Sequence, residues 1–301
     1  MYSLDSPAAK AAFTGITHIY TDLDGTMLAP GGRLLTNHEG EPSLELAEAL
    51  VLLKKAGLEI ILVTGRDVAQ CTEIMRLTNL DQFIAEMGCI VQFGYGATAQ
   101  KSYILGEWGT ERIGQSEGLT PYEMIEQSGI LEILTSTYQG KIEKHPLPGH
   151  REVTYLLRGH VDASSGGEVD RLLAGFDLPL QLMDNGIIHF KNHTLTDIDE
   201  LHVYHLMPRN TGKGQAVAAD MVAKGLVPAQ ALAIGDAPGD IPMGASTGSF
   251  VLVSNKKDSA LEELALATVA NPEALFIAAH PTADGWVEFA HALLAAKATL
   301  P

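Results

Sequence analysis

The chain has 301 residues, which is long for one compact domain, so we expect two domains. Hydrophobic residues make up 46% of the chain, enough for a sizeable core, and this argues against a disordered protein. The 37 acidic residues outnumber the 20 basic ones and give a formal net charge of −17, so we expect no nucleic-acid partner.

The first part of the chain is predicted to alternate strands with a helix. The apolar runs at residues 16–20, 58–63 and 83–85 lack a regular polar alternation, which is typical of strands buried on both faces of a parallel sheet. The stretch SLELAEALVLLKKA predicts a helix over Ser43–Ala56, with Ser43 as its N-cap.

The middle of the chain, from about residue 89 to 205, is richer in glycine, histidine and polar residues. It contains both helical and strand patterns. We predict helices over 121–138 and 167–174, and strands over 152–157, 180–183, 187–190 and 202–207. This α+β pattern with hairpins differs from the rest of the chain and predicts an inserted second domain.

The last part of the chain returns to the first pattern. Residues 231–234 and 250–253 predict buried strands, and residues 214–224 and 286–297 predict amphipathic helices. The order of strands and helices therefore predicts an α/β core formed by residues 1–88 and 206–301. An α+β domain of residues 89–205 is inserted into it.

We expect a cytoplasmic protein with no membrane segment. No apolar run approaches the roughly 18 residues that a membrane-spanning helix needs. The N-terminal segment has no basic stretch followed by an apolar one, so we expect no secretory signal. The two cysteines, Cys71 and Cys89, form no CxxC pair and are predicted to be reduced, buried thiols.

Two short motifs follow the first two predicted strands, at the end where open parallel sheets bind ligands. Asp22-Leu-Asp-Gly-Thr26 puts the carboxylates of Asp22 and Asp24 at a strand tip. Thr64 and Gly65 offer a hydroxyl and backbone N–H groups that can hold phosphoryl oxygens. For either motif alone, an ordinary turn remains the alternative.

Two further motifs lie in the last part of the chain. Lys213 opens a predicted helix, where a cation is unfavourable unless an anion binds there. The stretch GDAPGDIPMG sets Asp236 and Asp240 around a Pro-Gly pair, which predicts a type II turn. Such a turn would bring Asp240 back toward Asp236.

Together the four motifs supply acids, a hydroxyl and a lysine. Oxygen-only ligands favour a hard cation such as Mg²⁺ over zinc. A carboxylate nucleophile beside a divalent metal and a lysine suits phosphoryl transfer, because the metal and the lysine stabilise charge on the transferring oxygens. We therefore expect a small phosphorylated substrate.

The order DxDGT, then TG, then Lys, then GDxxxD resembles the four motifs of the haloacid dehalogenase (HAD) superfamily. The resemblance covers residues 1–88 and about 206 to the end, and DGWVEF at 284–289 resembles the DGV ending of its relatives. The large insert between the second and third motifs is similar to a C2-type cap of the C2B form. Proteins with that cap include Cof-type sugar-phosphate phosphatases, mannosyl-3-phosphoglycerate phosphatase, sucrose-phosphatase and phosphomannomutase. The resemblance implies a Rossmann-like parallel-sheet HAD core with an inserted α+β cap.

The resemblance also implies roles for individual residues. Asp22 would be the nucleophile and form an aspartyl-phosphate, and Asp24 would be the general acid/base. Mg²⁺ would be held by Asp22, by the main-chain carbonyl of Asp24 and by Asp236. Asp240 would act through water or orient the lysine. The phosphoryl oxygens would be held by Thr64, Gly65 and Lys213.

The chain departs from the pattern that it resembles at three positions. Relatives usually read GDSxND at the fourth motif, whereas here Ala237 replaces the serine and Gly239 replaces the asparagine. Many relatives read xENGA where this chain has residues 85–89, and Met87 replaces the asparagine. The changes at Ala237 and Gly239 concern the outer shell of the expected metal site, and the change at Met87 concerns the entry to the cap.

We expect a Mg²⁺-dependent phosphomonoester hydrolase that acts on a small phosphorylated metabolite, with a sugar phosphate as the favoured class. The alternatives are a phosphomannomutase-type sugar phosphomutase and a catalytically silent phosphate- or metal-binding protein. Four basic cap residues are candidates to face an anionic substrate, with ordinary surface charge as the alternative. They are Lys144, Arg151, Arg158 and Lys191.

Overall fold

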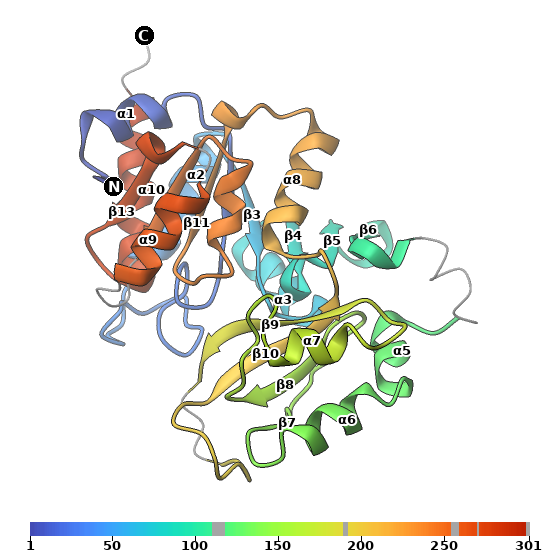
Figure 1. The fold of residues 1–301 in the computed structure, drawn as a ribbon. Coiled ribbons are helices and arrows are strands. Elements are labelled where there is room, and N and C mark those ends of the chain that lie inside the picture. The colour runs from blue at the N-terminus through green and yellow to red at the C-terminus, as the bar shows by residue number, and fades with distance from the viewer. Residues whose placement is uncertain (110–117, 189–191, 254–258, 270, 299–301) are drawn as a thin grey trace.

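The computed structural model describes residues 1–109, 118–188, 192–253, 259–269 and 271–298. A nine-stranded sheet forms the larger unit, with strand order β1-β13-β12-β11-β2-β3-β4-β5-β6 (Figure 1). The strands from β1 to β4 in this order are parallel, and β5 and β6 are antiparallel. The strands are β1 (Tyr2–Ser3), β2 (His18–Thr21), β3 (Glu59–Val63), β4 (Gln82–Ala85), β5 (Ile90–Phe93), β6 (Gln100–Tyr103), β11 (Ala231–Gly235), β12 (Ser249–Val253) and β13 (Leu275–Ala278).

Helices cover both faces of this sheet. Alternate residues of the central strands belong to two apolar clusters, because successive side chains of a strand point to opposite faces. Ile19 and Leu232 pack with the first group of helices, which are α1 (Pro7–Phe13), α2 (Glu45–Lys55), α3 (Val68–Thr78) and α10 (Thr282–Lys297). Tyr20 and Ala233 pack with the second group, which are α8 (Lys213–Lys224) and α9 (Ser259–Thr268). The predicted α/β core is therefore confirmed.

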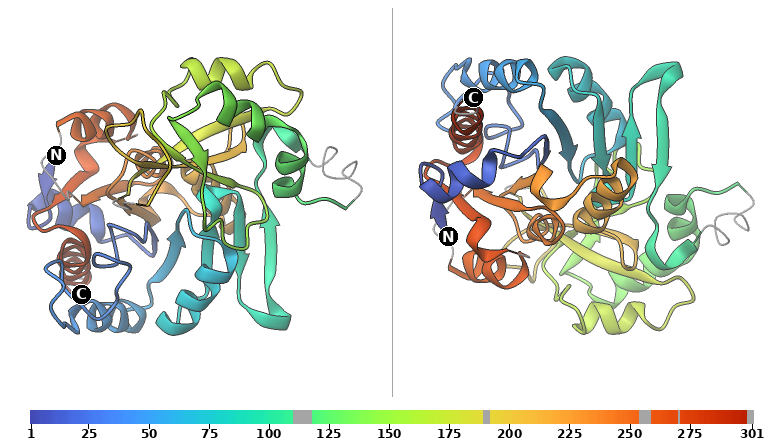
Figure 2. Two further views of the ribbon diagram at one scale, coloured as in Figure 1. Left: turned by 90° about the horizontal axis from the view of Figure 1, so that it is seen from below. Right: turned by 90° about the horizontal axis from the view of Figure 1, so that it is seen from above.

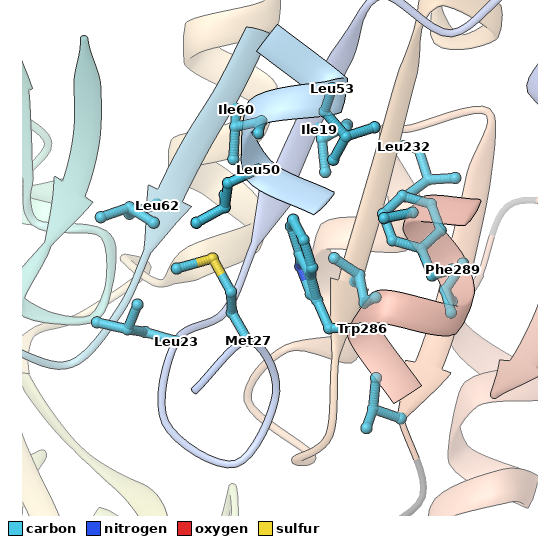
Figure 3. Close-up of a cluster of buried hydrophobic side chains, with 14 of the residues drawn as sticks. Ile19, Leu23, Met27, Leu50, Leu53, Ile60, Leu62, Leu232, Trp286 and Phe289 are labelled. Atoms are coloured by element: carbon cyan, nitrogen blue, oxygen red, sulfur yellow. The ribbon is translucent and has the colours of Figure 1, made fainter. Parts of the chain in front are cut away.

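Trp286 of α10 is the largest fully buried side chain of the first face, and Figure 3 shows it among Ile19, Met27 and Phe289. Its ring packs edge-on against Phe289, with 6.1 Å between the ring centroids. Its indole Nε1 donates a hydrogen bond of 3.0 Å to Thr21 Oγ1. Trp286 thus anchors the last residue of β2, the strand that leads into Asp22.

The smaller unit contains an antiparallel four-stranded sheet with strand order β7-β8-β10-β9. Figures 1 and 2 show it, with its helices, beside one end of the larger sheet. An apolar cluster joins the helices to the sheet. The elements are α5 (Pro121–Gln127), α6 (Ile130–Thr137), β7 (Ile142–Lys144), β8 (Tyr155–Gly159), α7 (Glu168–Leu173), β9 (Leu180–Ile187) and β10 (His202–Pro208). This separate sheet is the expected α+β cap.

The two sheets do not divide the chain at residues 89 and 205, the borders expected for the insert. β5 and β6 lie beyond residue 88 but pair with β4 in the large sheet. β10 extends to Pro208, past the expected border at residue 205, and pairs with β8 and β9. Hydrogen bonds between strands far apart in sequence decide these memberships, and no local pattern reveals them.

Three predictions about secondary structure need correction. The predicted helix over 121–138 is two helices, because Gly129 adopts a left-handed φ of 76° between α5 and α6. The predicted strands 180–183 and 187–190 are one strand, β9, as far as Ile187, and residues 189–190 lie outside the described part of the chain. Ser43 is not the N-cap of α2, since that position is Leu44, but Ser43 Oγ accepts a hydrogen bond from Glu45 N.

The described residues also form six short 3₁₀ helices. They are η1 (Glu86–Gly88), η2 (Gly96–Thr98), η3 (Gly106–Trp108), η4 (Pro228–Gln230), η5 (Ile241–Ala245) and η6 (Pro272–Ala274). Across the described residues, no helix has the length and apolar character needed to span a membrane.

Trp286→Phe is expected to lower the free energy of unfolding by about 1–2 kcal/mol, because the bond to Thr21 is lost and a small void remains. Urea unfolding followed by circular dichroism measures this. Leu77→Ala, at a side chain that is 70% exposed on α3, is the control and should change stability by less than about 0.5 kcal/mol. Equal effects of the two substitutions would contradict an anchoring role for Trp286.

Candidate active site

The carboxyl ends of three neighbouring parallel strands place the predicted site residues. β2 lies between β11 and β3 in the sheet, so Asp22, Thr64 and Asp236 follow adjacent strands at one edge. Asp22 N extends this ladder by donating to Ile234 O at 2.9 Å. Open parallel sheets bind their ligands beyond the carboxyl ends of the strands, and this edge is that end.

Lys213 joins two of the predicted acids. Its Nζ lies 2.6 Å from Asp22 Oδ1 and 2.6 Å from Asp240 Oδ1, and all three side chains are buried. Burial alone would lower the pKa of Lys213, but the charges of Asp22 and Asp240 raise it above its ordinary value. The lysine therefore stays positively charged inside the protein.

A glycine allows α8 to bring Lys213 to this position. A Cβ on Gly214 would lie only 2.6 Å from Pro242 O, so a side chain there would push α8 away from η5. Gly214 follows Lys213 directly, and Pro242 follows shortly after Asp240. The close packing of these two segments sets the distance between the lysine and Asp240.

Asp22, Asp236 and Asp240 form an acidic cluster. One oxygen from each carboxylate can be chosen so that all three lie within 4.8 Å of one another. Burial, together with the charge of Asp240, raises the pKa of Asp22 to about 7. Burial and the neighbouring Asp22 charge also raise the pKa of Asp236 well above its usual range. These oxygen donors fit a hard divalent cation such as Mg²⁺, whose charge would offset their repulsion.

The Asp236–Asp240 turn forms, but its type differs from the prediction. Asp240 N donates to Ala237 O at 3.0 Å, which closes the expected four-residue turn. Gly239 does not adopt a positive φ, so the turn is not type II. Instead, Asp240 Oδ2 accepts hydrogen bonds from the backbone N–H groups of Asp236 and Ala237, at 3.1 and 2.9 Å. These bonds let Asp240 hold the turn and Lys213 at once.

Asp24 lies apart from the acidic cluster, and sequence reasoning missed its partner. Arg66 Nε and Nη2 donate to the two carboxylate oxygens of Asp24 at 2.7 and 2.5 Å. The Asp24 side chain is 50% exposed, which places it at the rim of the site. Arg66 directly follows Thr64 and Gly65 in the sequence, and this position could have predicted that Arg66 lies at the site. Sequence reasoning also missed Thr26, whose hydroxyl donates to Asp236 Oδ1 at 2.7 Å.

The two predicted phosphate-binding residues after β3 are buried. Thr64 Oγ1 accepts a hydrogen bond of 3.2 Å from Arg66 N, so its hydroxyl hydrogen remains for an oxygen of a ligand. Gly65 lies directly beneath the cap. A Cβ there would lie 2.9 Å from Asn185 Nδ2 and 3.1 Å from His205 Nε2, so glycine permits the cap to close.

The basic cap residues do not present unpaired charge to the site. Lys144 pairs with Glu132 at 2.9 Å, and Arg158 pairs with Glu143. Arg151 does reach the site, but its Nη2 donates to Gly65 O at 3.0 Å and its other nitrogens bind Thr154 Oγ1 and Pro148 O. Lys191 lies outside the described residues.

Glu86 is a further residue whose role sequence reasoning missed. It is fully buried in η1, and its carboxylate accepts hydrogen bonds from cap residues. The donors are the backbone N–H groups of Glu152, Val153 and Thr154, at 2.9, 3.1 and 2.7 Å, and the Thr154 hydroxyl at 3.1 Å. Glu86 therefore ties the cap segment 152–154 to the core beside Gly65.

Two of the three departures from the family pattern, Gly239 and Met87, lie close together. A Cβ on Gly239 would lie 3.5 Å from Met87 Cε, and a Cβ on Gly65 would lie 3.2 Å from Met87 Sδ. Met87 is buried and adopts a left-handed φ of 59°, a conformation that suits asparagine better than methionine. The thioether thus occupies the space between Gly65 and the Asp236–Asp240 turn.

Comparisons with known proteins agree with this architecture. A family model described as haloacid dehalogenase-like hydrolase matches residues 19–107. The 5-amino-6-(5-phospho-D-ribitylamino)uracil phosphatase of Bacillus subtilis (strain 168) is 22% identical over 280 residues, covering 85% of this chain and 93% of that protein.

Solved structures share the fold over nearly the whole chain. The sucrose-phosphatase of Synechocystis sp. PCC6803, in complex with sucrose and phosphate, aligns with a TM-score of 0.60 at 15% identity, covering 92% of this chain and 98% of that one. A haloacid dehalogenase-like hydrolase from Bacteroides thetaiotaomicron aligns with a TM-score of 0.57 at 15% identity, covering 92% and 98%.

The raised pKa of Asp22 predicts a pH dependence of stability. Between about pH 4 and about pH 7, the folded protein keeps a proton that the unfolded chain has lost, so rising pH favours unfolding. Thermal unfolding of EDTA-treated protein should therefore show a steeper fall in Tm across this window for the wild type than for Asp22→Asn, whose amide does not titrate. Parallel curves for the two proteins would contradict the assignment.

Proposed function

Because this chain belongs to the haloacid dehalogenase-like hydrolases, we propose that it is a Mg²⁺-dependent phosphatase of small phosphorylated metabolites, with sugar phosphates as the favoured class. One observation carries the proposal. The Asp22 carboxylate, at the tip of β2, shares the Lys213 ammonium with Asp240 and lies within the acidic cluster that includes Asp236. A nucleophile, a fixed cation and a set of metal ligands therefore meet at one sheet edge.

In this mechanism Asp22 attacks the phosphorus atom while Lys213 holds Asp22 Oδ1. The bond between Asp22 and phosphorus forms, and the bond to the leaving oxygen breaks. Asp24 must first leave Arg66 and take up a proton, which it then gives to the leaving alkoxide. Water next attacks phosphorus, Asp24 accepts the proton of the water, the bond between Asp22 and phosphorus breaks, and inorganic phosphate leaves. Thr64 and Gly65 hold the phosphoryl oxygens through a hydroxyl and a backbone N–H.

Bound Mg²⁺ would supply positive charge that offsets the charge on the transferring oxygens. Asp22, Asp236 and the main-chain carbonyl of Asp24 would hold it, and Thr26 orients Asp236 through the bond to Oδ1. Asp240 acts as a positioning residue, because it fixes both the turn that carries Asp236 and the ammonium of Lys213.

The related proteins support a small phosphorylated substrate. The Bacillus subtilis relative is named for a phosphorylated ribitylamino compound, and the Synechocystis neighbour is a sucrose-phosphatase. Both names describe phosphate esters of hydroxylated compounds. A cytoplasmic location is in keeping with the two free, buried thiols of Cys71 and Cys89.

Asp22→Asn is expected to abolish phosphate release, because an amide is a poor nucleophile and forms no aspartyl-phosphate. Phosphate release from p-nitrophenyl phosphate and a panel of sugar phosphates measures this, with circular dichroism to verify folding. Asp81→Asn, at an exposed side chain paired with Lys54, is the control and should retain activity.

Retained turnover in Asp22→Asn would overturn the nucleophile assignment. The products also distinguish the alternatives. Free phosphate supports a hydrolase, and an isomeric sugar phosphate would indicate a phosphomutase. A folded wild type that releases no phosphate from any substrate in Mg²⁺ would indicate a silent binding protein.

Gly239→Asn is expected to raise the affinity for Mg²⁺, because it returns an amide to the turn beside Asp236 and Asp240. A Cβ at this position meets Met87 Cε at 3.5 Å, which is an ordinary van der Waals contact, so Gly239→Ala is a suitable control. Isothermal titration of EDTA-treated protein with Mg²⁺, and the Mg²⁺ dependence of phosphate release, measure the effect. An affinity that stays at the wild-type value would show that this turn needs no amide.

A further inference from the structure

Three side chains from different elements converge on Gly65. Asn185 Nδ2 of β9, His205 Nε2 of β10 and Met87 Sδ of η1 would lie 2.9, 3.1 and 3.2 Å from a Cβ at this position. Asn185 and His205 belong to the cap, whereas Gly65 and Met87 belong to the core. Cap and core therefore meet over the phosphate-binding loop.

This meeting point adjoins the proposed nucleophile. β2 and β3 are paired in parallel, with Thr21 opposite Leu62, so the residues after Thr21 run beside Val63, Thr64 and Gly65. Paired strands lie roughly 5 Å apart. A phosphate ester bound between Asp22 and Thr64 would therefore lie beside the cap side chains above Gly65.

The hydrogen bonds beneath His205 define its tautomer. The Thr154 hydroxyl lies 3.1 Å from Glu86 Oε2, 2.9 Å from Arg151 Nη1 and 3.1 Å from His205 Nδ1. A carboxylate only accepts and a guanidinium only donates, so the hydroxyl hydrogen goes to Glu86. The bond to His205 then runs from Nδ1–H to Thr154 Oγ1.

His205 consequently presents an acceptor to the site. Burial, with the nearby charges of Arg151 and Lys213, lowers the pKa of His205 well below its usual value, so the ring stays neutral. With the proton on Nδ1, the Nε2 atom above Gly65 carries a lone pair. The Asn185 amide nitrogen beside it is a donor. The pair offers one donor and one acceptor, without a formal charge.

The cations around this point are already engaged. Lys213 lies between Asp22 and Asp240, and Arg66 binds both oxygens of Asp24. Arg151 donates from all three of its nitrogens to oxygens of the chain. A carboxylate or second phosphate on the leaving group would thus compete with oxygens of the chain that Lys213, Arg66 and Arg151 already bind.

We propose that Asn185 and His205 are specificity-determining residues that bind a hydroxyl group of an uncharged leaving group. Asn185 Nδ2 donates to the hydroxyl oxygen, His205 Nε2 accepts the hydroxyl hydrogen, and the Met87 thioether packs against adjoining C–H groups. This inference rests on the proposed phosphatase function and narrows its substrates to phosphate monoesters of neutral polyols or sugars. Glu86, Thr154 and Arg151 act as positioning residues for His205.

The preference for an uncharged leaving group with a hydroxyl has a physical cause. A leaving group without a hydroxyl leaves the buried acceptor of His205 and the donor of Asn185 without a partner, and one with an anionic group loses hydration without a free counter-charge. Sites that hydrogen-bond a substrate hydroxyl discriminate strongly against analogues that lack it.

The test compares three substrates of the Mg²⁺-loaded enzyme. Glycerol 3-phosphate carries neutral hydroxyls, 3-phosphoglycerate differs by a carboxylate, and p-nitrophenyl phosphate has no aliphatic hydroxyl. We expect the wild type to prefer glycerol 3-phosphate over 3-phosphoglycerate by about tenfold or more in kcat/KM. An equal or reversed preference would overturn the inference.

Asn185→Leu and His205→Leu should each lower the ratio of kcat/KM for glycerol 3-phosphate to that for p-nitrophenyl phosphate by about tenfold, mainly through KM. Asn185 is exposed, so its variant keeps the test valid if the buried His205 variant fails to fold. Asn192→Leu and His160→Leu, at exposed cap positions, are the matched controls and should leave the ratio unchanged.

A ratio that stays constant in Asn185→Leu and in folded His205→Leu would refute the specificity assignment. The phosphatase proposal fails separately, if the wild type hydrolyses no p-nitrophenyl phosphate or if Asp22→Asn remains active. The two failures are therefore distinguishable in one set of assays.

Discussion

The contact of the Lys213 ammonium with Asp22 and Asp240 is the interaction on which the site depends. Three buried acids at one sheet edge repel one another, and burial raises the pKa values of Asp22 and Asp236. The lysine offsets part of this repulsion, because its Nζ lies 2.6 Å from Asp22 Oδ1 and 2.6 Å from Asp240 Oδ1. Three carboxyl groups share one ammonium, so a bound divalent cation would favour their ionised forms and then an anionic phosphoryl group.

The cap and the core are joined by a second polar network, beside Thr64 and Gly65. Glu86 of the core accepts hydrogen bonds from the cap backbone at 152–154, while Arg151 of the cap donates to the carbonyl of Gly65. The hydrogen bonds of this network run from the cap to the core in both segments, so they fix the position of His205 relative to Gly65. Buried polar groups that are all paired specify one arrangement, because any displacement leaves a donor or an acceptor unsatisfied.

Local sequence carried much of the fold and most of the core site. The buried strands of the parallel sheet are short apolar runs, and their order with the helices predicted the α/β layers that the structure has. Asp22, Thr64, Lys213 and Asp236 were predicted as site residues because each lies at the end of a predicted strand or the start of a helix, and the structure places them near one another with Asp240. The break at Gly129, the single long strand β9 and the pairing of β5 and β6 with the large sheet were not predicted, since they depend on contacts between distant residues.

The sequence by itself determined which types of side chain meet at the site. The tertiary structure decided which residues contact them. Residue type and spacing suffice to predict a group of carboxylates and a lysine at one site, because a parallel sheet brings the carboxyl ends of its strands to one edge. No spacing relates Glu86 to Thr154, Arg151 to Gly65, or Met87 to Gly239, because packing between separate elements makes these contacts. The charge available to a leaving group depends on which cations those contacts engage, and only the folded chain decides that.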